Sequence, residues 1–108
     1  MSRSEGKYGV MITTVANKDD AAKLAKLLLS EKLAACVQVM PIESFYTWKG
    51  DTANEAELLL LIKTKAALFD KAIKTIKSAH PYETPEIVCT DFIAGFSGYF
   101  SWIDEVTK

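Results

Sequence analysis

The sequence predicts an α+β fold in which helices cover one face of an antiparallel sheet. Two observations support this prediction: runs of β-branched residues alternate with amphipathic stretches, and the elements follow the order β-α-β-β-α-β. A chain of 108 residues is long enough for one compact domain with its own core. We expect residues 1–7 to be a flexible lead-in and residues 8–108 to form that single domain.

The first strand and the first helix are predicted near the N-terminus. Residues 8–15 read YGVMITTV, which is typical of a strand. Asn17 is placed to cap a helix, and Asp19 and Asp20 fall in its first turn, where the helix dipole favours negative charge. Apolar residues then recur at helical spacing, so we expect this helix to end near Lys32.

A long hairpin is predicted next. Its first arm, residues 35–48, contains Pro41, which indicates an edge strand or a bulge because proline cannot donate to the ladder. A turn is expected at residues 49–51. The returning arm, residues 55–64, holds an unbroken apolar run at 58–62, which is typical of a central strand buried on both faces.

The second half predicts a helix over residues 65–79 and a strand over residues 87–93. Gly95 and Gly98 are expected to break the chain before a short C-terminal helix. Two split β-α-β units of this kind form a ferredoxin-like sandwich. In that arrangement the first and third strands are central and the second is an edge.

The sheet face opposite the helices is predicted to be too apolar to remain in water. Leu58, Leu60 and Ile62 should point one way and Leu59 and Leu61 the other, because side chains alternate along a strand. One set of side chains packs against the helices, and the other set must be buried against something else. A homo-oligomer would bury this face and the edge strand, although the terminal helix could cover part of it.

The connection before the last strand contains the single histidine of the chain. Residues 80–87 read HPYETPEI, and each proline should hold the preceding residue, His80 or Thr84, extended. The side chains of His80 and Glu83 are suited to bind a proton, a metal ion or a ligand. Alternatively, His80 is a structural residue just beyond a helix C-terminus.

Composition argues against several classes of function. A formal net charge of −1 disfavours non-specific binding to nucleic acid. No apolar run approaches the roughly 20 residues that span a membrane, and the N-terminus lacks a signal-peptide core. Cys36 and Cys89 lie in apolar runs, which favours free thiols in a reducing compartment and hence the cytoplasm. We find no nucleophile elbow or P-loop, so we expect no enzyme and no required cofactor.

Five motifs in order resemble the CutA divalent-cation tolerance family, from about Tyr8 onward. They are LAACV at 33–37, YTWKG at 46–50, IKT at 62–64, the HPYETPEI segment at 80–87, and YFSWI at 99–103. The chain departs from the family pattern at Ser97-Gly98, where a Pro-Asp or a charged residue is common. The resemblance implies a PII-like homotrimer whose hairpins reach across to neighbouring subunits, and a role in tolerance to copper and other divalent cations.

Three functions remain open. In the first, the trimer binds a divalent metal such as copper through His80, Glu83 and Cys36. Cys89, Met11 and Met40 are further soft donors. One subunit cannot readily supply three or four convergent donors, so a neighbour would complete the site.

In the second, a small effector binds in a cleft between subunits. The candidate cleft residues are Trp48, Lys49, Glu57, Lys63, Tyr82 and Trp102. The aromatic members of this set are equally suited to packing at a subunit interface. In the third, the trimer is a structural or adaptor protein without a ligand.

Overall fold

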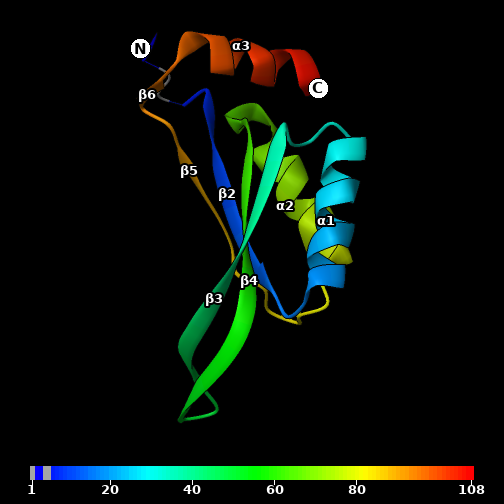
Figure 1. Ribbon diagram of the computed structural model, residues 1–108, viewed down its shortest axis with the longest axis vertical. Coiled ribbons are helices and arrows are strands. Elements are labelled where there is room, and N and C mark those ends of the chain that lie inside the picture. The colour runs from blue at the N-terminus through cyan, green and yellow to red at the C-terminus, as the bar shows by residue number, and fades with distance from the viewer. Residues whose placement is uncertain (1, 4–5) are drawn as a thin grey trace.

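The computed structural model describes residues 2, 3 and 6–108, and it contains a four-stranded antiparallel sheet with two helices on one face (Figure 1). The strand order is β3-β4-β2-β5, so the first and third strands of the motif are central, as predicted. The main elements are β2 (Tyr8–Val15), α1 (Lys18–Ser30), β3 (Cys36–Trp48), β4 (Asp51–Lys65), α2 (Phe69–Ala79) and β5 (Ile87–Asp91). This is the ferredoxin-like fold predicted from the sequence.

Helix α1 begins at the predicted cap and ends slightly earlier than predicted. The Asn17 side chain accepts a hydrogen bond from the Asp20 backbone N–H at 2.9 Å. The helix ends at Ser30 because Lys32 adopts a left-handed φ of 58°. The N–H of Leu33 then donates to the Leu28 carbonyl at 2.9 Å, which closes a Schellman motif and turns the buried Leu33 side chain into the core.

The hairpin formed by β3 and β4 is longer than predicted. The ladder continues to the pair Trp48–Asp51, so β4 begins four residues before Glu55. Lys49 and Gly50 have φ values of 51° and 84°, and a two-residue loop with both φ values positive is a type I′ turn. Glycine suits the second of these positions because it has no Cβ to clash there.

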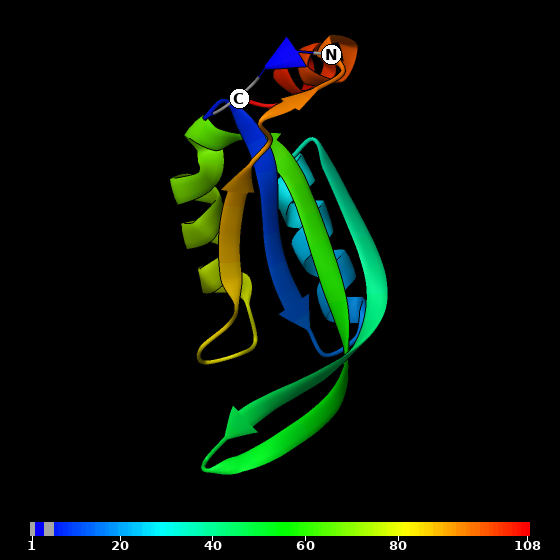
Figure 2. The ribbon, with the colours of Figure 1, turned by 90° about the vertical axis from the view of Figure 1, so that its left-hand side faces the viewer.

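Strand β2 pairs with β4 only as far as Leu58, whose partner on β3 is Pro41. Residues 42–57 therefore form a two-stranded ribbon beyond the sheet, and we call this ribbon the hairpin arm. Figures 1 and 2 show it projecting from the body and bending to one side. Pro41 lies on edge strand β3, as predicted, at the point where the arm leaves the body.

The core lies between the sheet and the helices α1 and α2. It includes Met11, Leu24, Leu60, Ile62 and Ile76, whose side chains are fully buried. Apolar side chains at helical spacing on α1 and α2 face this layer, which explains why both helices pack on the same side of the sheet.

On the opposite face of the sheet, Leu59 and Leu61 are only half-buried. The alternation predicted for this strand is therefore confirmed.

The C-terminal region differs from the prediction in three details. A short 3-10 turn, η1 (Ala66–Leu68), precedes α2, and β5 ends at Asp91 rather than at residue 93. Helix α3 (Ser97–Val106) includes Gly98 in its first turn, so only Gly95 precedes the helix. Gly95 lies in β6 (Ala94–Gly95), where a Cβ atom would be 2.6 Å from the Phe100 ring.

Helix α3 covers the end of the sheet rather than its open face (Figure 1). The Tyr8 ring stacks on the Phe100 ring at 4.6 Å between centroids, and Ile103 is fully buried beside them. The terminal helix therefore leaves Leu59 and Leu61 uncovered, and the open face still lacks a partner within the described chain.

The flexible lead-in expected at residues 1–7 stays a prediction for residues 1, 4 and 5, which lie outside the described residues. Ser2–Arg3 form the short strand β1, which pairs with β6. The N–H of Gly6 donates to the Asp91 carboxylate at 2.7 Å.

The burial pattern predicts a large difference between two Leu→Ala substitutions. Leu60→Ala should lower the free energy of unfolding by about 2–5 kcal/mol because it removes a fully buried side chain from the core. Leu29→Ala, on the outer face of α1 with 44% of the residue exposed, should cost less than about 1 kcal/mol. Urea denaturation measures both, and equal losses would contradict the described core.

Candidate functional site

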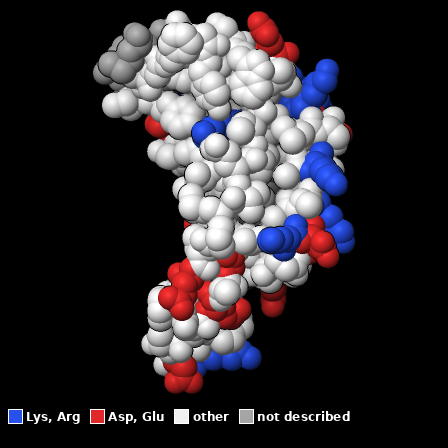
Figure 3. All heavy atoms as spheres, in the orientation of Figure 1, with Lys and Arg blue, Asp and Glu red and all other residues white. Residues whose placement is uncertain are grey.

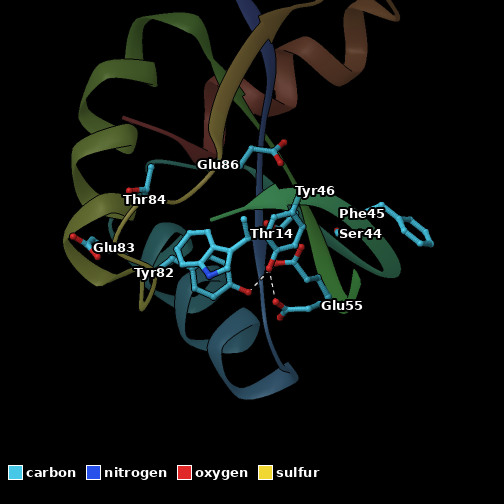
Figure 4. A pocket seen from close by; sticks show the side chains of 11 residues that line it. Thr14, Ser44, Phe45, Tyr46, Glu55, Tyr82, Glu83, Thr84 and Glu86 are labelled. Atoms are coloured by element: carbon cyan, nitrogen blue, oxygen red, sulfur yellow. Dashed lines mark hydrogen bonds between the residues drawn. The ribbon is translucent and has the colours of Figure 1, made fainter. Parts of the chain in front are cut away.

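A pocket of about 630 Å³ lies where the hairpin arm meets the 80–86 segment that joins α2 to β5 (Figure 4). Its walls come from three parts of the chain: the arm, the end of β2 and the 80–86 segment. We call it the glutamate pocket. The lining carboxylates are Glu55, Glu57, Glu83 and Glu86. The lining aromatic residues are Phe45, Tyr46, Trp48 and Tyr82. The remaining lining residues are Thr14, Ser44 and Thr84.

The pairing of β4 with β3 positions the two glutamates of the arm. Glu55 and Glu57 are two residues apart on β4, so their side chains project from the same face. Ser44 lies directly opposite Glu55 in the register with β3.

Each of these glutamates accepts a hydrogen bond from a tyrosine. The Tyr82 hydroxyl donates to Glu57 Oε2 at 2.8 Å, and the Tyr46 hydroxyl donates to Glu55 Oε1. Figure 4 shows Tyr46, Glu55 and Tyr82 converging, whereas the Phe45 ring points away from them.

The two phenols are held in their protonated form by their surroundings. Burial of the phenol, its hydrogen bond to Glu57 and the negative charges of Glu57 and Glu55 raise the pKa of Tyr82 well above the usual range for tyrosine. The hydrogen bond to Glu55 is the main cause that raises the pKa of Tyr46. Tyrosine is already protonated at neutral pH, and the raised pKa values keep both phenols as hydrogen-bond donors to Glu57 and Glu55 in more alkaline solution as well.

His80 lies behind the pocket wall and is buried. Its Nε2 donates to the Thr14 carbonyl oxygen at 2.8 Å, and its Nδ1 accepts from the Tyr82 N–H at 3.1 Å. This pair of bonds requires the tautomer with the proton on Nε2. The hydrogen-bond acceptor of the His80 ring is thus a backbone carbonyl of β2 and not one of the last carbonyls of α2. Through this bond, His80 connects the 80–86 segment to the sheet.

Pro81 shapes the start of this segment as predicted from the sequence. His80 is extended, with φ −77° and ψ 133°, and it ends α2 directly before Pro81. The centroids of the Tyr82 and His80 rings are 4.9 Å apart. Lys77 adds a further tie, because its Nζ donates to the Glu83 carbonyl at 3.1 Å.

The structure divides the predicted cleft residues between two ends of the molecule. Trp48, Glu57 and Tyr82 line the glutamate pocket together with Glu83. Lys49 is at the tip of the arm, with its Nζ 5.7 Å from the centroid of the Trp48 ring.

Trp102 belongs to α3 instead, and Lys63 lies beside that helix. Lys63 Nζ is 5.9 Å from the centroid of the Tyr99 ring, and the centroids of the Trp102 and Tyr99 rings are 5.6 Å apart. Lys63 also lines a smaller pocket of about 240 Å³ beside Phe96.

The predicted metal donors do not converge within one chain. Cys36 pairs with Lys63 in the ladder, at the end of β3 nearest α3, whereas His80 and Glu83 lie at the other end of the sheet. Met11 is fully buried, and burial raises the pKa of the Cys89 thiol. Among the residues that the structure describes, no group of three histidine, cysteine, aspartate or glutamate side chains is placed to hold a metal ion.

Several pocket residues were missed by the sequence analysis, chiefly Glu55, Glu86 and Tyr46. The alternation of Glu55 and Glu57 on one predicted strand is a signal that could have identified the first of them.

Figure 3 shows how charge is distributed on the surface: acidic side chains gather over the arm and the adjoining body, whereas lysines lie over the side that carries α1.

Comparison with known proteins identifies the family. A family model described as CutA1 divalent ion tolerance protein matches residues 9–106. The chain is 40% identical over 99 residues to the divalent-cation tolerance protein CutA of Thermus thermophilus, covering 91% of this chain and 96% of that protein. It is also 40% identical over 100 residues to the chloroplastic protein CutA 1 of Oryza sativa, covering 92% of this chain but only 56% of the rice protein.

A solved structure agrees with these matches. The periplasmic divalent cation tolerance protein CutA from Archaeoglobus fulgidus superposes with a TM-score of 0.91 at 33% identity, covering 94% of this chain and 99% of the other. Within the described residues, no helix is long and apolar enough to cross a membrane. The resemblance seen in the five motifs is confirmed, and the chain belongs to the CutA1 divalent ion tolerance protein family.

Proposed function

We propose that this protein contributes to divalent-cation tolerance by binding metal ions in the glutamate pocket of a homotrimer. The observation that carries the proposal is the charge of the pocket: within the described part of the chain, the charged residues that line it are all glutamates. Carboxylate oxygens are the ligands that hard divalent cations prefer. The family name agrees with this chemistry.

The proposed ligands are the carboxylates of Glu57 and Glu55. One oxygen of each accepts a hydrogen bond from a tyrosine, which leaves the other oxygen of each for a cation. Two carboxylates are too few for a tight site, so we propose that a neighbouring subunit supplies the remaining donors.

The oxygen-rich lining fits a hard cation better than reduced copper, which favours thiolate and thioether ligands. Copper(II) remains the candidate suggested by the family resemblance. His80 would need to release its bond to Thr14 or to Tyr82 in order to bind it.

The homotrimer is supported by the uncovered face of the sheet. Leu61 and Leu59 are half-buried on this face, and the neighbouring Val88 and Met40 are 51% and 44% exposed. Register places these side chains on one continuous surface, because Met40 pairs with Leu59, and Ile12 pairs with both Leu61 and Val88. A second copy would remove this surface from water. The number three rests on the family resemblance.

The proposed role is binding rather than catalysis, and the proposed compartment is the cytoplasm. Cys36 and Cys89 are both free cysteines in the structure, which suits a reducing environment. The names of relatives include chloroplastic and periplasmic proteins. An adaptor trimer without a ligand is the outcome if no cation binds to the intact assembly.

The metal proposal predicts a selective effect of one substitution in the pocket. Glu57→Gln should weaken binding of Mn²⁺ or Cu²⁺ by at least about tenfold, because the carboxamide removes a charged ligand from the site. Isothermal titration of each metal into the purified assembly measures this loss. Glu105→Gln, on α3 at the opposite end of the molecule, is the matched control and should leave the affinity unchanged. Equal affinities for the two variants would contradict the proposed ligands.

The hydrogen bonds of His80 predict a structural role that can be separated from metal binding. His80→Ala should lower the free energy of unfolding by about 1–3 kcal/mol, because it leaves the Thr14 carbonyl and the Tyr82 N–H without their partner. Denaturant titration in the presence of EDTA measures this loss without any metal contribution. An unchanged stability together with lost metal binding would instead identify His80 as a direct ligand.

The oligomer is tested by its mass in solution. Multi-angle light scattering should give three times the subunit mass at micromolar concentration. Leu61→Asp should dissociate the assembly, because it places a charge in the proposed interface. Leu29→Asp, on the outer face of α1, should not. A wild-type chain that stays monomeric would contradict the proposed assembly.

A further inference from the structure

We propose that the glutamate pocket also binds an organic cation, and that a linear polyamine is the class that fits it best. This inference goes beyond metal binding and does not require it. It begins from size: in the single chain the pocket has a volume of about 630 Å³, which falls in the range of small-molecule sites.

The charge of the pocket selects the sign of the ligand. Glutamates line both walls, with Glu55 and Glu57 on the arm and Glu83 and Glu86 on the 80–86 segment. Among the described residues that line it there is no lysine or arginine. Phosphate-bearing effectors such as nucleotides would therefore be repelled, whereas a cation would be attracted before contact.

Aromatic rings supply the second element of recognition. Tyr46, Trp48 and Tyr82 line the same pocket, and an ammonium group over such a ring is stabilised by the negative face of its π-system. The chain itself already uses this interaction, because Lys49 Nζ lies 5.7 Å from the centroid of the Trp48 ring. A ligand ammonium group would make the same contact inside the pocket, and its methylene groups would pack on the rings.

The separation of the glutamates favours several charges on one flexible chain. In Figure 4, Glu83 and Glu55 lie on opposite sides of the Tyr82 ring. A linear polyamine carries ammonium groups at intervals along an apolar chain, so it can pair with carboxylates on both walls and cross the aromatic surface between them.

The test is a calorimetric titration of spermidine into the intact assembly in buffer that contains EDTA, so that metal binding does not contribute. Glu57→Gln should weaken spermidine binding by about tenfold, and Trp48→Leu by about 3- to 30-fold, the range expected for loss of a cation–π contact. Glu105→Gln on α3 and Phe96→Leu, where Phe96 is 73% exposed, should bind as the wild type does. Tetramethylammonium, with one charge, should bind much more weakly than spermidine.

Absence of spermidine binding to the wild type would overturn the inference. So would an affinity that Trp48→Leu leaves unchanged, because attraction to the acidic surface alone would then explain the binding. Spermidine binding that persists in a protein without affinity for metals would contradict the metal proposal and support this one. The two proposals can therefore fail separately.

Discussion

Strand β4 is the element on which the rest of the structure depends. Over residues 58–63 it pairs with both β2 and β3 in the centre of the sheet, and over residues 51–57 it pairs with β3 alone. The same strand therefore supplies the core through Leu60 and Ile62 and the pocket through Glu55 and Glu57. Continuous backbone pairing connects the carboxylates of the arm to the body through one strand, although the arm has no second layer behind it.

A second tie closes the pocket from the other side. His80 bonds to the Thr14 carbonyl and to the N–H of Tyr82, and the Tyr82 hydroxyl reaches Glu57. This chain of bonds links the end of α2, the end of β2 and the arm. A buried imidazole with both nitrogens hydrogen-bonded has a structural role, because one of the two hydrogen bonds would have to break before the ring could bind a metal ion or another ligand.

The sequence predicted the fold better than the site. Local patterns in the sequence predict the strand positions, the edge position of Pro41 and the two faces of β4. They do so because buried side chains recur with the period of the strand or helix that carries them. The pocket depends on a ribbon that bends toward a distant segment, and no local pattern records that contact. Lys63 and Tyr82 both belong to recognised motifs, yet the sheet places Lys63 near α3 and Tyr82 near the arm.

The arm has a mechanical consequence for whatever enters the pocket. A two-stranded ribbon twists and bends more easily than a four-stranded sheet covered by helices. One wall of the pocket therefore belongs to a compliant element and the other to a rigid one. A ligand that bridges them would restrict the motion of the ribbon, and part of its binding free energy would be offset by that loss of conformational entropy. Occupancy would then be detectable at the hairpin tip, well away from the bound molecule, as a change in flexibility rather than in shape.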